Sequence, residues 1–173
     1  MPIIIGQGGP HDRRALPLST RKGNHIPNEI RPEAPPARMK AARDLVMKRF
    51  PNNEERSLTQ IYNCMGLVFA SRRSWIDIDS LPVILQDDEY HLVSDLKDAR
   101  IGDLVVYGNG GNSGAAHIGM IVRKEPNLQK ASWNIKVMSQ WGADGEYLHA
   151  MEDVPTETFG APMQFWTDRK VLS

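Results

Sequence analysis

Apolar positions in the first half of the chain recur with the period of a helix. The first predicted helix has apolar side chains spaced mostly three or four residues apart: Met39, Ala42, Leu45, Val46 and Phe50. Pro51 follows and ends it. A second helix is predicted over roughly 64–74, because Asn63 is a good N-cap residue. The polar stretch 51–63 is expected to be a connection, and 77–79 a turn.

The second half of the chain consists of apolar runs that are typical of β-strands, most of them divided by Gly, Asn or Pro. These runs cover residues 104–107, 117–122, 135–140 and 163–166. The two middle runs are expected to form an antiparallel hairpin about a loop near Asn127-Leu128-Gln129. Residues 83–98 fit one short helix and a loop. Helices first and strands afterwards predict an α+β domain.

Residues 1–36 differ in composition from the rest of the chain. They contain seven of the twelve prolines, several glycines and arginines, and little periodicity. Such a segment buries too little apolar surface to offset the entropy lost on ordering it. We therefore expect a disordered or linker-like leader over 1–36, whose basic residues could touch a partner. One compact domain is expected over 37–173.

Charge and hydropathy exclude several classes of protein. The 21 basic and 21 acidic residues balance, which does not suggest a general nucleic-acid or anionic-membrane surface. No apolar stretch approaches the roughly 20 residues of a membrane span. The apolar start, Met1–Gly6, lacks the basic flank and the length of a signal peptide. We expect a cytoplasmic protein, with export by a specialised route as the open alternative.

Cys64 is the residue whose surroundings suggest nucleophilic chemistry. It lies where a loop turns into the second predicted helix, and the positive end of a helix dipole lowers the pKa of a thiol. His117, at the start of a predicted strand, would accept the thiol proton and return it to the leaving group. The alternative interpretation of this lone cysteine is a buried small hydrophobic residue.

A third polar side chain should orient the imidazole of His117. In the expected hairpin, His117 faces the neighbourhood of Ser139 and Gln140. The side chains of these two residues point to opposite faces, so a shift of register by one residue exchanges them. Gln140 is the first choice, because its amide oxygen can accept the imidazole N–H. Ser139 is the second choice, and His149, from a following strand, is the third.

Three blocks of sequence accompany these candidates. They are Asn63-Cys64-Met65-Gly66-Leu67-Val68, then Gly102-Asp103-Leu104-Val105-Val106-Tyr107, then His117-Ile118-Gly119-Met120-Ile121. Papain-like cysteine peptidases of the NlpC and CHAP group have Asp-Cys-Ser-Gly-Leu-Val at a helix start. That motif is followed by Gly-Asp-Leu-Val with an aromatic residue, and then by His-Val-Gly-Ile. From Tyr62 to Val122 the chain resembles this group.

The resemblance implies a papain-like core, with N-terminal helices packed on a small antiparallel β-sheet. It also implies hydrolysis or acyl transfer at an amide bond, most often in peptidoglycan stem peptides. The nucleophile maps to Cys64 and the base to His117. His149, within Leu148-His149-Ala150, is then a displaced third residue that competes with Gln140. By analogy, the Tyr62 hydroxyl or the Cys64 backbone N–H helps to bind the oxyanion.

The chain departs from the pattern of the group at two positions. Asn63 replaces the usual acid and Met65 the usual serine, so the substrate groove need not suit a cell-wall peptide. We expect a peptide or peptidoglycan-like substrate. A leader joined to a catalytic module suggests a bacterial effector toxin, with an immunity protein as a partner. The alternatives are a binding domain that has lost catalysis, and an acyl transferase or deamidase.

Other motifs add no further chemistry. The glycine-rich run 108–114 lacks the Gly-Lys-Ser/Thr of a phosphate-binding loop, so we expect a hairpin loop that borders the site. Cys64, His117 and His149 lack the paired spacings of a zinc site, and we expect neither a metal nor a cofactor. The tryptophans are expected in the core or the groove. Trp141, beside the candidate third residue, is the one to test for contact with substrate.

Overall fold

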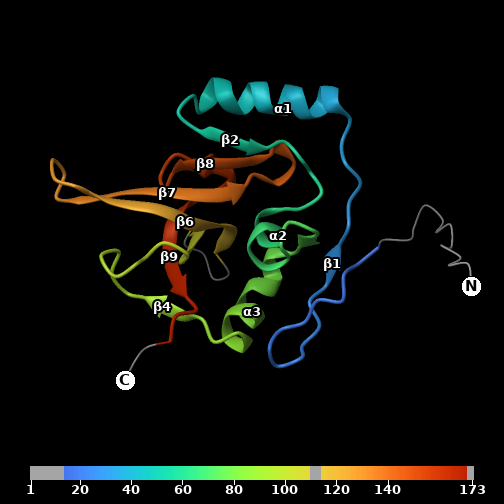
Figure 1. Cartoon of the computed structure of the whole chain (residues 1–173), viewed down its shortest axis with the longest axis horizontal. Helices are drawn as coiled ribbons and strands as arrows, with labels where there is room; N and C mark the ends of the chain where they lie inside the picture. The colour runs from blue at the N-terminus through green and yellow to red at the C-terminus, as the bar shows by residue number, and fades with distance from the viewer. Residues whose placement is uncertain (1–13, 110–113, 171–173) are drawn as a thin grey trace, which may run out of the picture.

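The fold is built on one large antiparallel sheet. A computed structural model describes residues 14–109 and 114–170, within which seven strands pair in the order β2-β8-β7-β6-β5-β9-β4 (Figure 1). In chain order, the strands are β2 (Glu54–Ser57), β4 (His91–Val93), β5 (Leu104–Gly108), β6 (Ala115–Asn127), β7 (Ser132–Gln140), β8 (Glu146–Ala150) and β9 (Ala161–Thr167). The structure therefore confirms a mixed α/β protein with a large antiparallel sheet.

Short helices connect the strands and pack on the sheet. They are α1 (Pro36–Arg49), α2 (Cys64–Phe69), α3 (Leu81–Asp87) and α4 (Thr156–Phe159), with 3₁₀ turns over Ile78–Ser80 and Gly142–Asp144. The predicted first helix is confirmed by α1. The predicted second helix ends early, because Ser71 and Arg72 adopt left-handed backbone angles with φ of 49° and 62°. Among the described residues, no helix has the length and apolar character that crossing a membrane requires.

The strand predictions hold for the four apolar runs, which become β5, β6, β7 and β9. The predicted hairpin joins β6 to β7, and its last pair, Asn127 with Ser132, closes the expected loop. Strand β2 was not predicted. It is a polar edge strand with exposed side chains, so no apolar alternation marks it. Because β2 and β8 extend one side of the sheet, the sheet is larger than the small one expected.

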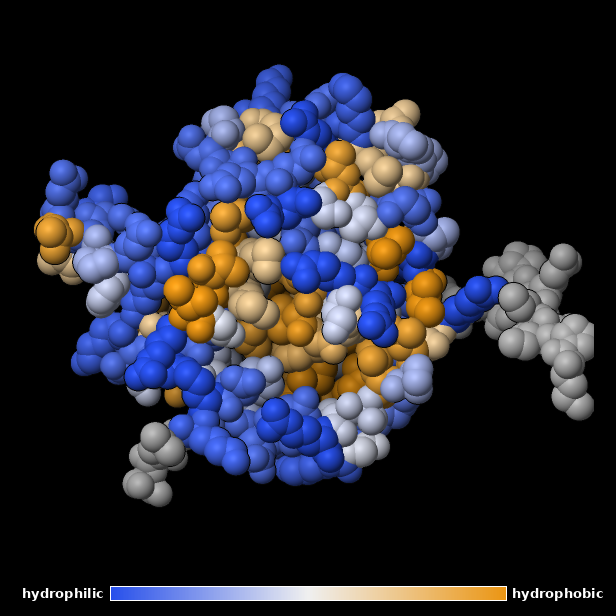
Figure 2. Space-filling view, viewed as in Figure 1, coloured by the Kyte–Doolittle hydropathy of each residue, from blue (hydrophilic) through white to orange (hydrophobic). Residues whose placement is uncertain are grey.

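Two hydrophobic clusters lie on opposite faces of the sheet, because successive residues of a strand point to opposite sides. On β5, Val105 and Tyr107 belong to the first cluster, whereas Leu104 and Val106 belong to the second. Helix α1 packs in the first cluster, and α2 and α3 pack in the second. Figure 2 shows hydrophobic side chains gathered between β9 and these two helices, with hydrophilic ones around them.

Part of the predicted leader lies against the domain. The Thr20 hydroxyl and the Asn24 amide both donate hydrogen bonds to the Asp87 carboxylate of α3, at 2.7 and 2.6 Å. Ile26 is 4% exposed and belongs to the second cluster. The expectation of a disordered or linker-like segment is therefore corrected for residues 14–36. A few well-placed contacts order this segment, and an average composition does not reveal them.

The same segment continues into a short strand beside the sheet. Strand β1 (Asn28–Glu29) pairs antiparallel with β3 (Trp75–Ile76), just after α2 (Figure 1). Farther along, Glu33 accepts hydrogen bonds from the Thr59 hydroxyl and the Gln60 N–H. The segment is thus held on both sides of β1 before it enters α1. The remainder of the predicted leader, residues 1–13, lies outside the described residues.

We predict that Ile26→Ala lowers the free energy of unfolding by about 2–4 kcal/mol, because it leaves a cavity in the second cluster. Urea denaturation followed by tryptophan fluorescence measures this change. Ile30→Ala is the matched control. Ile30 is 37% exposed, and we expect its replacement to cost less than about 0.5 kcal/mol. An unchanged stability of the Ile26→Ala variant would show that this segment is not part of the folded domain.

Candidate active site

Asn63 fixes the position of Cys64 at the start of α2. Its side-chain oxygen accepts hydrogen bonds from the Gly66 N–H at 3.0 Å and the Ile76 N–H at 3.1 Å. Its amide nitrogen donates to the Ile76 carbonyl at 2.7 Å. One side chain therefore caps the helix, as the sequence predicts, and also joins it to β3. Gly66 is required here, because a Cβ would lie 1.7 Å from the Ser74 carbonyl oxygen.

The thiol of Cys64 is buried and protonated. Its side chain belongs to the second cluster together with Ile118 of β6, and the residue is 8% exposed. Burial raises the pKa of the thiol to about 11, although backbone N–H groups of Ile118, Met65 and Cys64 itself act in the opposite direction. The predicted lowering of the pKa by the helix start is therefore outweighed by desolvation. Without a further change in its surroundings, Cys64 is not a thiolate at neutral pH.

His117 lies near the start of β6, opposite Tyr107 of β5. Its ring stacks on Phe159, with centroids 3.9 Å apart and planes 8° from parallel, and it also contacts the Tyr107 ring at 5.5 Å. Its Nε2 is buried and has no hydrogen-bond partner among the described residues. Burial, followed by the charge of His149, lowers the pKa of His117 to about 3. The imidazole is therefore neutral at neutral pH.

The sulfur and the imidazole reach one cavity from two sides. Because side chains alternate along β6, Ile118 faces the second cluster with Cys64, whereas the His117 ring contacts Tyr107 in the first. Within the described residues, no hydrogen bond joins the thiol to the ring. Both residues nevertheless line the same cavity of about 540 Å³. Its other walls include Phe159 and Trp75 and, from the segment before α1, Asn28 and Arg31.

Ser139 and His149 form a buried network on the side of the first cluster. The Ser139 hydroxyl lies 2.8 Å from His149 Nε2 and accepts a hydrogen bond from Trp141 Nε1 at 3.1 Å. His149 Nδ1 lies 2.8 Å from the Ala150 carbonyl, which can only accept, so Nδ1 carries the hydrogen. Nε2 then accepts the Ser139 O–H. Both ring nitrogens of His149 are thus occupied, and burial lowers its pKa to about 4.

Gln140, the first choice for the third residue, lies on the opposite side of β7 from Ser139. Its amide nitrogen donates to the carbonyls of Thr59 and Gly142 at 2.9 and 2.8 Å. Its amide oxygen is buried and has no partner among the described residues. Of the three candidates, it is His149 whose charge acts on the pKa of His117. None of the three donates a hydrogen bond to the His117 ring or accepts one from it in the part of the chain described.

Two aromatic residues singled out in the sequence lie in the interior. The Tyr62 hydroxyl donates to the buried Glu146 carboxylate, so in this conformation it is not directed at an oxyanion. Trp141 is 3% exposed and packs in the first cluster against Phe50 and Tyr147. Of the two places expected for the tryptophans, Trp141 therefore occupies the core, and it does not line the cavity. It lies between the end of β7 and the 3₁₀ turn Gly142–Asp144.

The aromatic residues that do line the cavity are Trp75 and Phe159. For Trp75 this is one of the two places, core or groove, that the sequence analysis expects, whereas Phe159 was not singled out there. Arg31 stacks over the Trp75 ring, 3.7 Å from its centroid, and Trp75 Nε1 donates to the Gln60 carbonyl at 2.7 Å. Arg31 belongs to the segment that was interpreted as a leader. Neither aromatic residue stands in a motif, and their places depend on contacts between distant parts of the chain.

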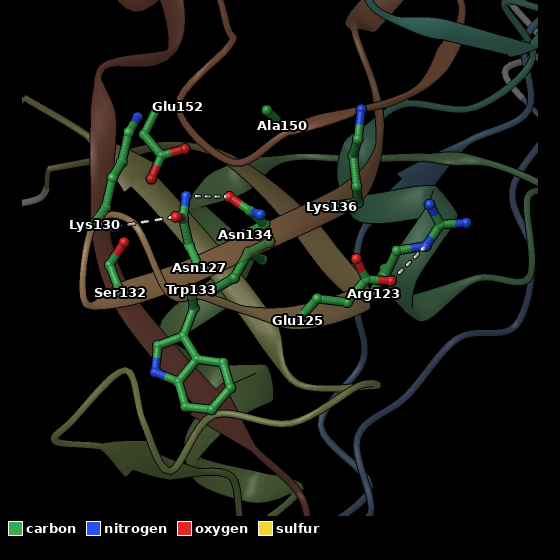
Figure 3. A pocket seen from close by; sticks show the side chains of 11 residues that line it. Arg123, Glu125, Asn127, Lys130, Ser132, Trp133, Asn134, Lys136, Ala150 and Glu152 are labelled. Carbon is green, nitrogen blue, oxygen red and sulfur yellow. Dashed lines mark hydrogen bonds and ion pairs between the residues drawn. The ribbon is translucent and has the colours of Figure 1, made fainter.

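A second cavity, of about 420 Å³, lies along the β6–β7 hairpin (Figure 3). Two pairs of its charged and polar side chains contact each other: Arg123 with Glu125, and Asn127 with Asn134. It contains neither the thiol nor His117. Because neither Cys64 nor His117 lines it, we do not assign the active site to it.

The remaining motifs add no group to the site. Residues 110–113 of the glycine-rich run lie outside the described residues, so the expected loop is not described there. Over residues 14–109 and 114–170, no three side chains of His, Cys, Asp or Glu gather as a metal ion would require. No protein-family model, curated protein or solved structure matches the chain. The site therefore has to be interpreted from its own residues.

The two buried histidines predict a loss of stability in mild acid. Below a pH of about 6.5 the unfolded chain binds protons that the native rings, with a lowered pKa, do not. The free energy of unfolding should therefore decrease as the pH is lowered from about 6.5 to 4. The decrease is up to about 1.4 kcal/mol per pH unit for each histidine. His117→Gln should reduce this slope by about half, measured by urea denaturation at a series of pH values.

His91→Gln is the control for this prediction, because His91 is exposed on β4. We expect it to retain the wild-type slope. If the His117→Gln variant also keeps the full slope, the native His117 ring is protonated as readily as in the unfolded chain.

Proposed function

We propose that this protein is a thiol-dependent hydrolase of amide bonds with a papain-like core. The observation that carries the proposal is that Cys64 and His117, from separate parts of the chain, line one cavity. The support from sequence is the order of the three blocks around these residues. In this proposal Cys64 is the nucleophile and His117 is the general base.

The reaction begins from a neutral thiol and a neutral imidazole. The thiol proton passes to the imidazole, the sulfur attacks the carbonyl carbon, and the C–N bond breaks as the imidazolium protonates the leaving amine. Water then hydrolyses the thioester. Because the thiol and the ring are not hydrogen-bonded at rest, the proposal requires a turn of the ring or a water in the cavity that relays the proton.

The start of α2 supplies donors for the developing oxyanion. The backbone N–H groups of Cys64 and Met65 are directed toward the sulfur, since both act to lower the thiol pKa. A carbonyl oxygen bound beside the sulfur would accept from the same region. The substrate in this proposal is a peptide or a peptidoglycan-like stem peptide, and an effector toxin with an immunity protein fits the same chemistry. Acyl transfer and deamidation differ from hydrolysis only in the acceptor and the leaving group.

A second candidate function is a binding domain that does not catalyse. It is favoured by the pKa of about 11 for the Cys64 thiol and of about 3 for His117, because proton transfer between two such groups is strongly uphill. In such a domain the cavity would bind a ligand without covalent chemistry, and Cys64→Ala would leave binding intact.

The chemistry is tested by the rate at which iodoacetamide alkylates Cys64 at pH 7. If His117 assists removal of the thiol proton, His117→Gln should slow alkylation at least about tenfold, which corresponds to about 1.4 kcal/mol of lost assistance. Mass spectrometry of the intact protein measures the rate, with His91→Gln as the control. Equal rates in wild type and the His117→Gln variant would exclude the hydrolase and leave the binding domain.

The products then define the reaction. Incubation with peptidoglycan stem peptides, with Cys64→Ala as the inactive control, should give cleaved peptides in the hydrolase. An adduct would identify a transferase, and a gain of 1 Da at a side-chain amide, about the difference between NH₂ and OH, would identify a deamidase.

A further inference from the structure

Helix α4 places one aromatic ring directly on His117. Phe159 is the last residue of α4, is half-buried, and lines the same cavity as Cys64 and His117. The stacked geometry, with centroids 3.9 Å apart and planes 8° from parallel, covers one face of the imidazole. The Tyr107 ring, tilted by 53° at 5.5 Å, contacts the imidazole from β5. His117 thus lies in an aromatic site built by two distant segments.

Ion pairing and close packing hold α4 in this place. Arg49, at the end of α1, donates to both carboxylate oxygens of Glu157, one of them at 2.8 Å. Gly160 follows Phe159 with φ of 75°, and a Cβ there would lie 2.2 Å from the Gly108 carbonyl carbon. Only glycine fits so close to the end of β5. The Phe159 ring is therefore anchored on both sides along the chain.

Within residues 14–109 and 114–170, no hydrogen bond to Nε2 fixes the orientation of the imidazole. Nε2 has no partner among the described residues, and the nearby polar candidates Ser139 and His149 bond to each other instead. In the described residues, aromatic rings lie against the imidazole, and the third polar residue that the sequence suggests does not. His149 is the titratable group whose charge acts on His117, and no carboxylate is among the groups that act on its pKa.

We propose that Phe159 is a positioning residue for His117, whose stacked ring holds the imidazole at the cavity and keeps water from the face that it covers. This inference rests on the proposed function, since positioning matters for the reaction only if His117 is the base. Phe159 itself accepts no proton and forms no bond in the reaction. Its role is to set the orientation and the hydration of the base.

The experiment compares Phe159→Ala with Phe165→Ala. Phe165 on β9 is also half-buried and also packs against the first cluster, but it makes no ring contact with His117 in the described residues. The pKa of His117 is measured by NMR titration of its ring protons, assigned with the His117→Gln variant. Phe159→Ala should expose the imidazole and raise its pKa by at least about one unit, while Phe165→Ala should not.

The pH profile of Cys64 alkylation is the second readout, and its midpoint should move in the same direction in Phe159→Ala alone. An unchanged His117 pKa in Phe159→Ala, or equal shifts in both variants, overturns the inference. If Phe159→Ala does not fold, Phe159→Leu and Phe159→Tyr replace it. The leucine variant should shift the pKa and the tyrosine variant should restore it, and equal values in these two also overturn the inference.

Failure of the proposed function gives a different result. If alkylation is independent of His117 in every variant but the NMR shift appears, Phe159 orders the ring while His117 is not the base. If alkylation depends on His117 but Phe159→Ala leaves the NMR titration unchanged, the result supports the hydrolase and excludes the positioning role of Phe159.

Discussion

The site depends on the hydrogen bonds of Asn63. One amide caps α2, binds both the N–H and the C=O of Ile76, and so fixes the helix start against β3. Cys64 follows Asn63 directly in the chain. The close approach of Gly66 to Ser74 sets how tightly α2 packs against the chain that leads into β3. In this chain an amide stands where the resembling peptidases have a carboxylate. An amide can donate as well as accept, which is what joining the helix to a strand carbonyl requires.

Burial, more than charge, sets the chemistry of the two candidate groups. Desolvation raises the thiol pKa and lowers the imidazole pKa, so the neutral forms dominate on both sides of the cavity. A thiolate–imidazolium pair is therefore not the resting state. Any catalysis has to couple proton transfer to the attack on the substrate, or to follow a change in the surroundings of the ring. Phe159, which covers the imidazole, lies where such a change would begin.

Local patterns predicted the elements whose signals are local. The apolar spacing before Pro51 predicted α1, the cap preference of Asn63 predicted the start of α2, and the apolar runs 117–122 and 135–140 predicted the β6–β7 hairpin. Strand β2 was missed, because an exposed edge strand carries no apolar alternation. The sequence analysis also paired Cys64 with His117, and both residues line one cavity in the structure. The sequence did not reveal that Cys64 and the His117 ring lie on opposite faces of the sheet, because the face of a strand residue depends on the register of pairing. Nor did it reveal the stack of Phe159 on His117, because these two residues are far apart in the chain.

The central claim is that the thiol and the imidazole share one cavity, and a label on the thiol tests it most directly. Cys64 is alkylated to completion with ¹³C-labelled iodoacetamide, and nuclear Overhauser contacts from the labelled methylene are measured. The account predicts contacts to the ring protons of His117 and Phe159. Contacts confined to hydrocarbon side chains of the second cluster, such as Ile118 and Ile84, would contradict it.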